Sequence, residues 1–80
     1  MSKYEKIWQR IASGQADRNI EFDDLVWLLE YKGFKKRHRG GSHVIFTKPG
    51  VRERITLQPE RSKAKAYQVR QVRAILVKER

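Results

Sequence analysis

The 80-residue chain contains no cysteine, so disulfide bonds and thiolate zinc sites are excluded. Its two histidines are too few to suggest a metal site without cysteine, and we expect neither a metal nor a cofactor. No apolar run approaches the length of a membrane span or of a signal-peptide core. We therefore expect a cytoplasmic protein that has no membrane partner.

Acidic residues are scarce in the second part of the chain. The formal net charge is +10, yet residues 1–34 are nearly neutral, with five basic and six acidic side chains. Between Lys35 and Arg73, twelve lysines and arginines stand against only Glu53 and Glu60. Positive charge concentrated in this way favours a polyanionic partner, most commonly the phosphates of a nucleic acid. The alternative is a basic surface that serves solubility alone.

The near-neutral part predicts two amphipathic helices. Ser2 and Glu5 are spaced as a capping box, and apolar residues then recur with the helical period over 3–13, up to Gly14. A second helix is predicted to begin at Asp23 and to end at Gly33.

Trp27 and Tyr31 lie off the leucine stripe of this second helix. We expect them to receive the first helix, and an intermolecular surface is the alternative.

Three strands are predicted next, over residues 34–39, 42–48 and 51–58, and a valine-rich helix follows Pro59. Gly40-Gly41 and Pro49-Gly50 are connections short enough for antiparallel hairpins. The fold class is therefore α+β: a three-stranded antiparallel sheet with helices packed on one face. We expect a single domain over 1–80, in which the helix at 3–13 is added to a core at 20–80.

Side-chain alternation divides the residues of this sheet between two faces. The face that takes the helices is apolar: Phe34, Val44, Phe46, Ile55 and Leu57. The opposite face combines His43 with five basic side chains: Lys35, Arg37, Arg39, Arg52 and Arg54. His38 has the core-facing parity and is interpreted as structural. The assignment assumes that no β-bulge near Gly41 shifts the register.

Four further residues are candidate phosphate contacts. Gly41 and Ser42 precede His43, and a glycine backbone can approach a phosphate closely; the alternative role of the glycines is a tight hairpin. Lys63 and Lys65 lie just before the last helix, where a cation is unfavourable by roughly 0.3–1 kcal/mol. A functional reason for both is phosphate binding at the helix start, and a solvated loop is the alternative.

One short motif lies between a leucine-rich helix that ends at Gly33-Phe34 and a valine-rich helix: Gly41-Ser42-His43-x-Ile45-Phe46. In this order the chain resembles the HicA toxins of type II toxin–antitoxin systems over about residues 20–78. The resemblance implies a fold like that of double-stranded-RNA-binding domains (α-β-β-β-α) and ribosome-independent cleavage of mRNA, with His43 as the catalytic residue. It also implies a cognate HicB-type antitoxin that binds the toxin and masks this histidine.

Two features depart from the family pattern. Many relatives have a second histidine directly after the first, where this chain has Val44. The helix at 3–13 is an addition to the usual toxin, and no family role extends to it.

The chemistry of His43 suits RNA cleavage without a metal. An imidazole can accept or donate a proton near neutral pH, and RNA supplies its own nucleophile in the 2′-hydroxyl. The first candidates for cations that stabilise the phosphorane are Arg37, Arg39 and Arg54. Three hypotheses stay open: a metal-independent endoribonuclease toxin, a non-catalytic RNA-binding module of the same fold, and a regulator whose basic face mainly docks an acidic antitoxin.

Overall fold

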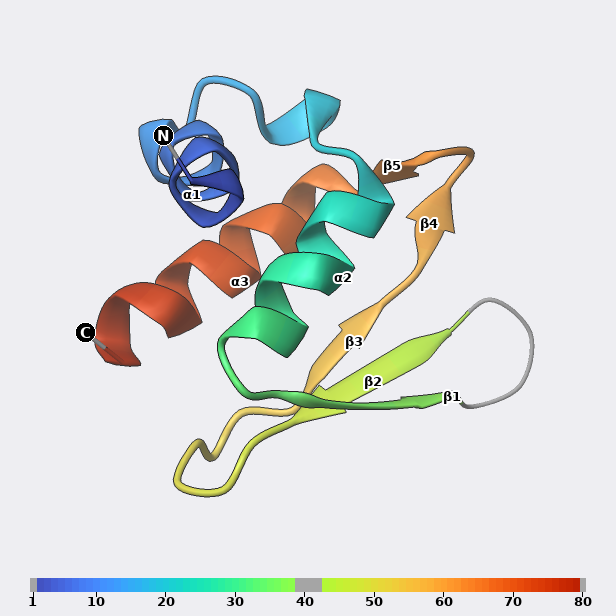
Figure 1. The fold of residues 1–80 in the computed structure, drawn as a ribbon. Coiled ribbons are helices and arrows are strands. Elements are labelled where there is room, and N and C mark those ends of the chain that lie inside the picture. Colours follow the sequence, from blue (N-terminus) through green and yellow to red (C-terminus); the bar gives the residue numbers. More distant parts are fainter. Residues whose placement is uncertain (1, 39–42, 80) are drawn as a thin grey trace.

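The computed structural model describes residues 2–38 and 43–79. Strands β1, β2 and β3 form an antiparallel sheet in that order, and the helices lie on one side of it (Figure 1). The predicted α+β class is confirmed. In chain order the elements are α1 (Lys3–Ser13), the 3₁₀ turn η1 (Asp17–Asn19), α2 (Phe22–Tyr31), β1 (Lys35–His38), β2 (Val44–Thr47), β3 (Ile55–Leu57), β4 (Pro59–Glu60), β5 (Lys63–Ala64) and α3 (Ala66–Glu79).

Helix α1 begins and ends where its sequence predicts. The backbone N–H of Glu5 donates to Ser2 Oγ at 3.1 Å, which satisfies one of the free donors of the first turn. At the other end Gly14 adopts φ 72°, the left-handed conformation that glycine tolerates best.

The predicted contact between the first two helices is also confirmed. The ring of Tyr4 in α1 stacks on Tyr31 of α2, with 5.0 Å between centroids, and Trp27 stacks on Tyr31 at 5.1 Å. The ammonium group of Lys3 lies 4.6 Å from the centroid of the Trp27 ring.

Helix α2 begins at Phe22, one residue before the predicted start at Asp23, and its cap position is Glu21. Glu21 makes no side-chain capping bond, and the N–H of Phe22 instead donates to Ser62 O at 2.9 Å. The C-terminus follows the prediction: Gly33 has φ 97° and donates to Glu30 O at 3.0 Å.

The partner that caps α2 comes from a hairpin that the sequence does not predict. β4 and β5 pair Pro59 with Ala64 and Glu60 with Lys63. Ala64 also donates its N–H to Ile20 O at 2.9 Å, just before α2. The segment between the sheet and α3 is therefore bonded to the start of α2 rather than being a free loop.

The three main strands are shorter than predicted. The Pro49–Gly50 turn is closed by a bond from the N–H of Val51 to Lys48 O at 3.0 Å, and β3 begins only at Ile55. The Gly40–Gly41 connection and the possible bulge near Gly41 lie outside the described residues.

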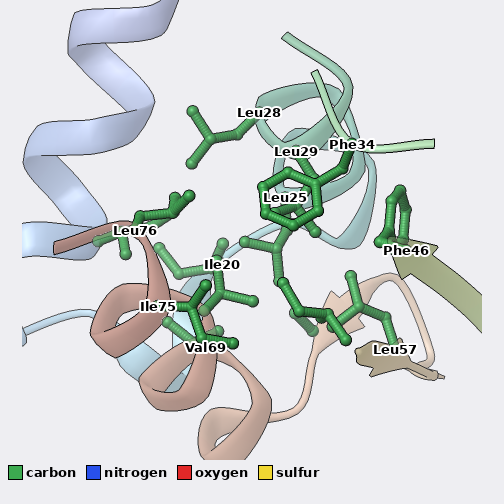
Figure 2. Close-up of a cluster of buried hydrophobic side chains, with 14 of the residues drawn as sticks. Ile20, Leu25, Leu28, Leu29, Phe34, Phe46, Leu57, Val69, Ile75 and Leu76 are labelled. Carbon is green, nitrogen blue, oxygen red and sulfur yellow. The ribbon is translucent and has the colours of Figure 1, made fainter. Parts of the chain in front are cut away.

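One buried cluster joins the helices to the sheet. Figure 2 shows side chains of α2, α3 and the strands converging on one centre, with Leu25, Phe46 and Leu57 among them. Each predicted core residue of the strand region is at most 6% exposed, and Ile7 and Ile11 bring α1 into the same cluster. The apolar stripe of α3 is buried as predicted: Val69, Val72, Ile75 and Leu76.

Arg73 of α3 ties the N-terminal segment to this core. Its Nη1 donates to Ile11 O at 3.0 Å and to Asp17 Oδ1 at 2.9 Å, and the Asp17 side chain is only 13% exposed. The guanidinium group thus satisfies a carbonyl in the last turn of α1 and neutralises a largely buried carboxylate.

We predict that Arg73→Met lowers the free energy of unfolding by about 1–3 kcal/mol, because Asp17 loses its closest charged partner and Ile11 O keeps only the N–H of Gly14 as a donor. Urea denaturation measures this difference. Arg70→Met is the matched control: Arg70 is 56% exposed and lies 4.0 Å from Asp17. Its change should stay within about ±0.5 kcal/mol. Equal losses in the two variants would contradict the special role of Arg73.

Candidate nucleic-acid interface

The side of the sheet that faces away from the helices is lined by basic and polar side chains. β2 alternates between buried and half-buried side chains, so its two faces are distinct. On the outer side Ile45 lies between Arg37 of β1 and Thr56 of β3. One row further, Lys35 lies opposite Thr47. Arg37, Lys35 and Thr56 are all exposed.

His43 is exposed and stands immediately before β2. The next residue, Val44, is 6% exposed and belongs to the core. Because successive side chains of an extended chain alternate, His43 continues the outer row of Ile45. The register of β2 with β3, continued by one residue, sets Gln58 opposite His43. Two residues along a strand span about 6.6 Å, so Arg37 and Thr56 form the row nearest to this imidazole.

The two arginines before β3 differ in their distance from His43. Burial alternates from Arg52 to Leu57, and Arg52 and Arg54 share the exposed parity of Thr56. By register Arg54 falls in the row of Thr47, about 13 Å along the sheet from His43. We call this surface the open face; its described residues are Lys35, Arg37, His43, Ile45, Thr47, Arg54 and Thr56.

Arg52 lies beyond the open face. It shares a shallow hollow with Glu53, Ile75 and Lys78, at the end of the sheet opposite His43. A hydrogen bond with its own backbone and a second from Lys78 lower the pKa of Glu53. Glu53 is thus an anion at neutral pH. Arg52 therefore has a carboxylate as its neighbour, whereas none of the described residues of the open face is acidic.

The two lysines before α3 have different partners. Lys63 Nζ lies 2.5 Å from Glu21 Oε1, so its charge is paired with an acid at the start of α2. Lys65 Nζ instead donates to the uncharged Gln58 Oε1 at 3.2 Å, and it forms no ion pair with any described residue. Of the two, Lys65 brings an unneutralised charge to the end of the sheet where His43 lies.

Two residues of α3 join this site although the sequence analysis does not include them. Gln68 is only 4% exposed, and its Oε1 accepts the backbone N–H of Gln58 at 3.1 Å. Its Nε2 lies 3.5 Å from the hydroxyl oxygen of Tyr67. The sequence signal that could have identified Gln68 is its position on the apolar stripe of the last helix, four residues before Val72.

The second histidine lies on the other side of the sheet. The register pairs His38 with Val44, on the helix side, in agreement with its parity. His38 is nevertheless exposed, because β1 is an edge strand and all four of its residues are exposed. His38 therefore does not lie in the core, although its parity places it on the helix side of the sheet.

Three predicted contacts, Arg39, Gly41 and Ser42, lie outside the described residues. Among the residues that are described, no three acidic or histidine side chains are grouped as metal ligands. In the same part of the chain no helix is long and apolar enough to span a membrane.

Comparison with known proteins identifies the class of protein to which this fold belongs. The family model described as "HicA toxin of bacterial toxin-antitoxin" matches residues 22–78, which include α2, the sheet and α3. The chain therefore belongs to the HicA toxin family and is a toxin of a toxin–antitoxin system. Helix α1 precedes the matched range. Searches of curated proteins and of solved structures found no match.

We predict that RNA binding weakens steeply with salt and that Arg37→Gln reduces the log–log slope by about 0.7, the value for one phosphate contact on a single strand. Lys6→Gln is the control, because Lys6 is exposed on α1, outside the open face. Its slope should equal that of the wild type. Fluorescence anisotropy at several salt concentrations gives the slopes of both variants. Identical slopes would show that Arg37 does not contact the RNA.

Proposed function

We propose that this toxin is a metal-independent endoribonuclease that cleaves mRNA and that His43 is its catalytic residue. The observation that supports this proposal best is the exposed position of His43 at the end of an open face that carries Arg37 and Lys35. None of the described residues of that face is acidic. A phosphate chain can therefore approach the imidazole without repulsion from a carboxylate.

In the proposed reaction RNA provides the nucleophile. The 2′-oxygen attacks the adjacent phosphorus while His43 accepts the 2′-hydroxyl proton as general base. The bond from phosphorus to the 5′-oxygen of the next nucleotide breaks, and solvent protonates that oxygen. The products are a 2′,3′-cyclic phosphate and a 5′-hydroxyl, and no metal is needed.

Arg37 and Lys65 are the described cations closest to this chemistry. Arg37 lies in the neighbouring row of the open face, and Lys65 Nζ is bonded to Gln58, opposite His43 in the continued register. Both can stabilise negative charge on the phosphorane. Arg54 and Lys35 lie one row further and would hold a more distant phosphate.

The alternative is a non-catalytic RNA-binding module of the same fold. It is favoured by the fact that no described residue of the open face is acidic, so this face offers no carboxylate as a second acid–base group for His43. In that case His43 would contact only the RNA backbone.

An antitoxin of the HicB type would inhibit the proposed enzyme by covering the open face. Acidic groups on such a partner would complement the cations of this face, and contact at its end would bury His43.

Our central prediction concerns His43→Ala, which should reduce RNA cleavage by about 10²–10⁴-fold, the usual contribution of one general base. The loss should be measured in the presence of EDTA, with the wild type active under the same conditions. Stability should change by no more than about ±0.5 kcal/mol, because the side chain is exposed.

His38→Ala is the matched control for this experiment. It removes the other exposed imidazole, which the register places on the helix side of the sheet. This variant should cleave at the wild-type rate. A folded His43→Ala protein that cleaves near that rate would refute the catalytic assignment and leave the RNA-binding module.

The two histidines also test how the antitoxin binds. Diethyl pyrocarbonate should modify both in the free toxin, since both are exposed. In the complex His43 should be protected and His38 should still react. Continued reaction of His43 in a stable complex would show that inhibition does not act through masking.

A further inference from the structure

Tyr67 differs from the other large hydrophobic side chains that are exposed among the described residues, which are Tyr31 and Val77. Tyr67 is 57% exposed and Tyr31 is 60% exposed. The Tyr31 ring, however, already stacks on Tyr4 and on Trp27. Within the described residues Tyr67 has no aromatic or cationic partner, and its ring is free to stack on a ligand.

The Tyr67 side chain has one polar contact within the described residues. Its hydroxyl lies 3.5 Å from Nε2 of Gln68, a residue that is only 4% exposed. The other end of the Gln68 carboxamide accepts the backbone N–H of Gln58. At 3.5 Å the contact between Tyr67 and Gln68 is at the long limit of a hydrogen bond, so it favours this position of the ring without fixing it.

Gln58 connects this ring to the proposed reaction centre. Its backbone is bonded to Gln68, its side chain accepts a hydrogen bond from Lys65 Nζ, and the continued register sets it opposite His43. Residues paired across antiparallel strands have Cα atoms about 4.5–5.5 Å apart. Gln58, directly after β3, is thus bonded to Lys65 and Gln68 and is set opposite His43 by the continued register, while Tyr67 contacts Gln68.

We propose that Tyr67 stacks on a nucleobase next to the cleaved phosphate and that Lys65 binds the phosphate of the same nucleotide. Single-stranded RNA is the ligand that needs both groups, because unpaired bases stack on aromatic rings while cations hold the backbone. The proposal rests on the proposed function, since it takes His43 as the point of cleavage. Stacking tolerates any base, so this subsite strengthens binding without selecting a sequence.

The test uses His43→Ala protein, which we expect to bind RNA without cleaving it. In this background Tyr67→Leu should weaken binding of a single-stranded RNA by about 5- to 150-fold, the range for one stacked base. Tyr67→Phe keeps the ring and should stay within about threefold of the parent. The salt slope should be unchanged in Tyr67→Leu and lower by about 0.7 in Lys65→Gln, because only the second variant loses a phosphate contact.

Tyr31→Leu is the control for an exposed tyrosine outside the site and should bind RNA as the parent does. Circular dichroism verifies folding of every variant. Unchanged affinity in folded Tyr67→Leu would overturn the proposal, as would equal losses in Tyr67→Phe and Tyr67→Leu, which would assign the effect to the hydroxyl. A Tyr67→Leu protein that loses antitoxin binding but keeps RNA binding would overturn it in favour of a protein contact.

These outcomes separate the stacking proposal from the proposed function. If the wild type does not cleave RNA but Tyr67→Leu weakens RNA binding as expected, the enzyme assignment fails and the stacking subsite stands. If the wild type cleaves RNA and Tyr67→Leu binds normally, only the stacking subsite fails.

Discussion

Helices cover the three-stranded sheet on one face only, and side chains of β2 and β3 therefore alternate between a buried and a more exposed face. Phe46 and Ile55 are 0% exposed and lie opposite each other in the register. A slip by one residue would turn both to solvent and bring the neighbouring polar and charged side chains into the core. The packing that stabilises the fold therefore also keeps His43 and Arg37 on the open face.

The net charge of +10 is larger than the positive charge available for RNA binding, because several cations form contacts that stabilise the fold. Arg73 holds Asp17 and the end of α1, and Lys63 is paired with Glu21. By contrast, Lys65 and the cations of the open face form no ion pair with any described residue. Their desolvation by an RNA phosphate would break no protein ion pair, and this favours them as the binding groups.

Local signals made much of this architecture predictable. Ser2 and Gly14 mark the ends of α1, Gly33 ends α2, and the two-residue period separates Phe46 from His43. The β4–β5 hairpin was missed because strands of two residues show no alternation. The bond from Gln58 to Gln68 links positions ten residues apart through a buried side chain, which no local pattern reveals. The exposure of His38 likewise depends on how far the helices reach over an edge strand.

The central claim is that RNA binds the open face and the adjoining start of α3. The most direct test is an amide chemical-shift titration of ¹⁵N-labelled His43→Ala protein with a single-stranded RNA. Our account predicts that the largest shifts occur in β2, in β3 and at the start of α3, at Lys65 and Tyr67, whereas the basic residues of α1, Lys3, Lys6 and Arg10, are unaffected. Shifts concentrated on α1 and α2, with the strands unchanged, would contradict it.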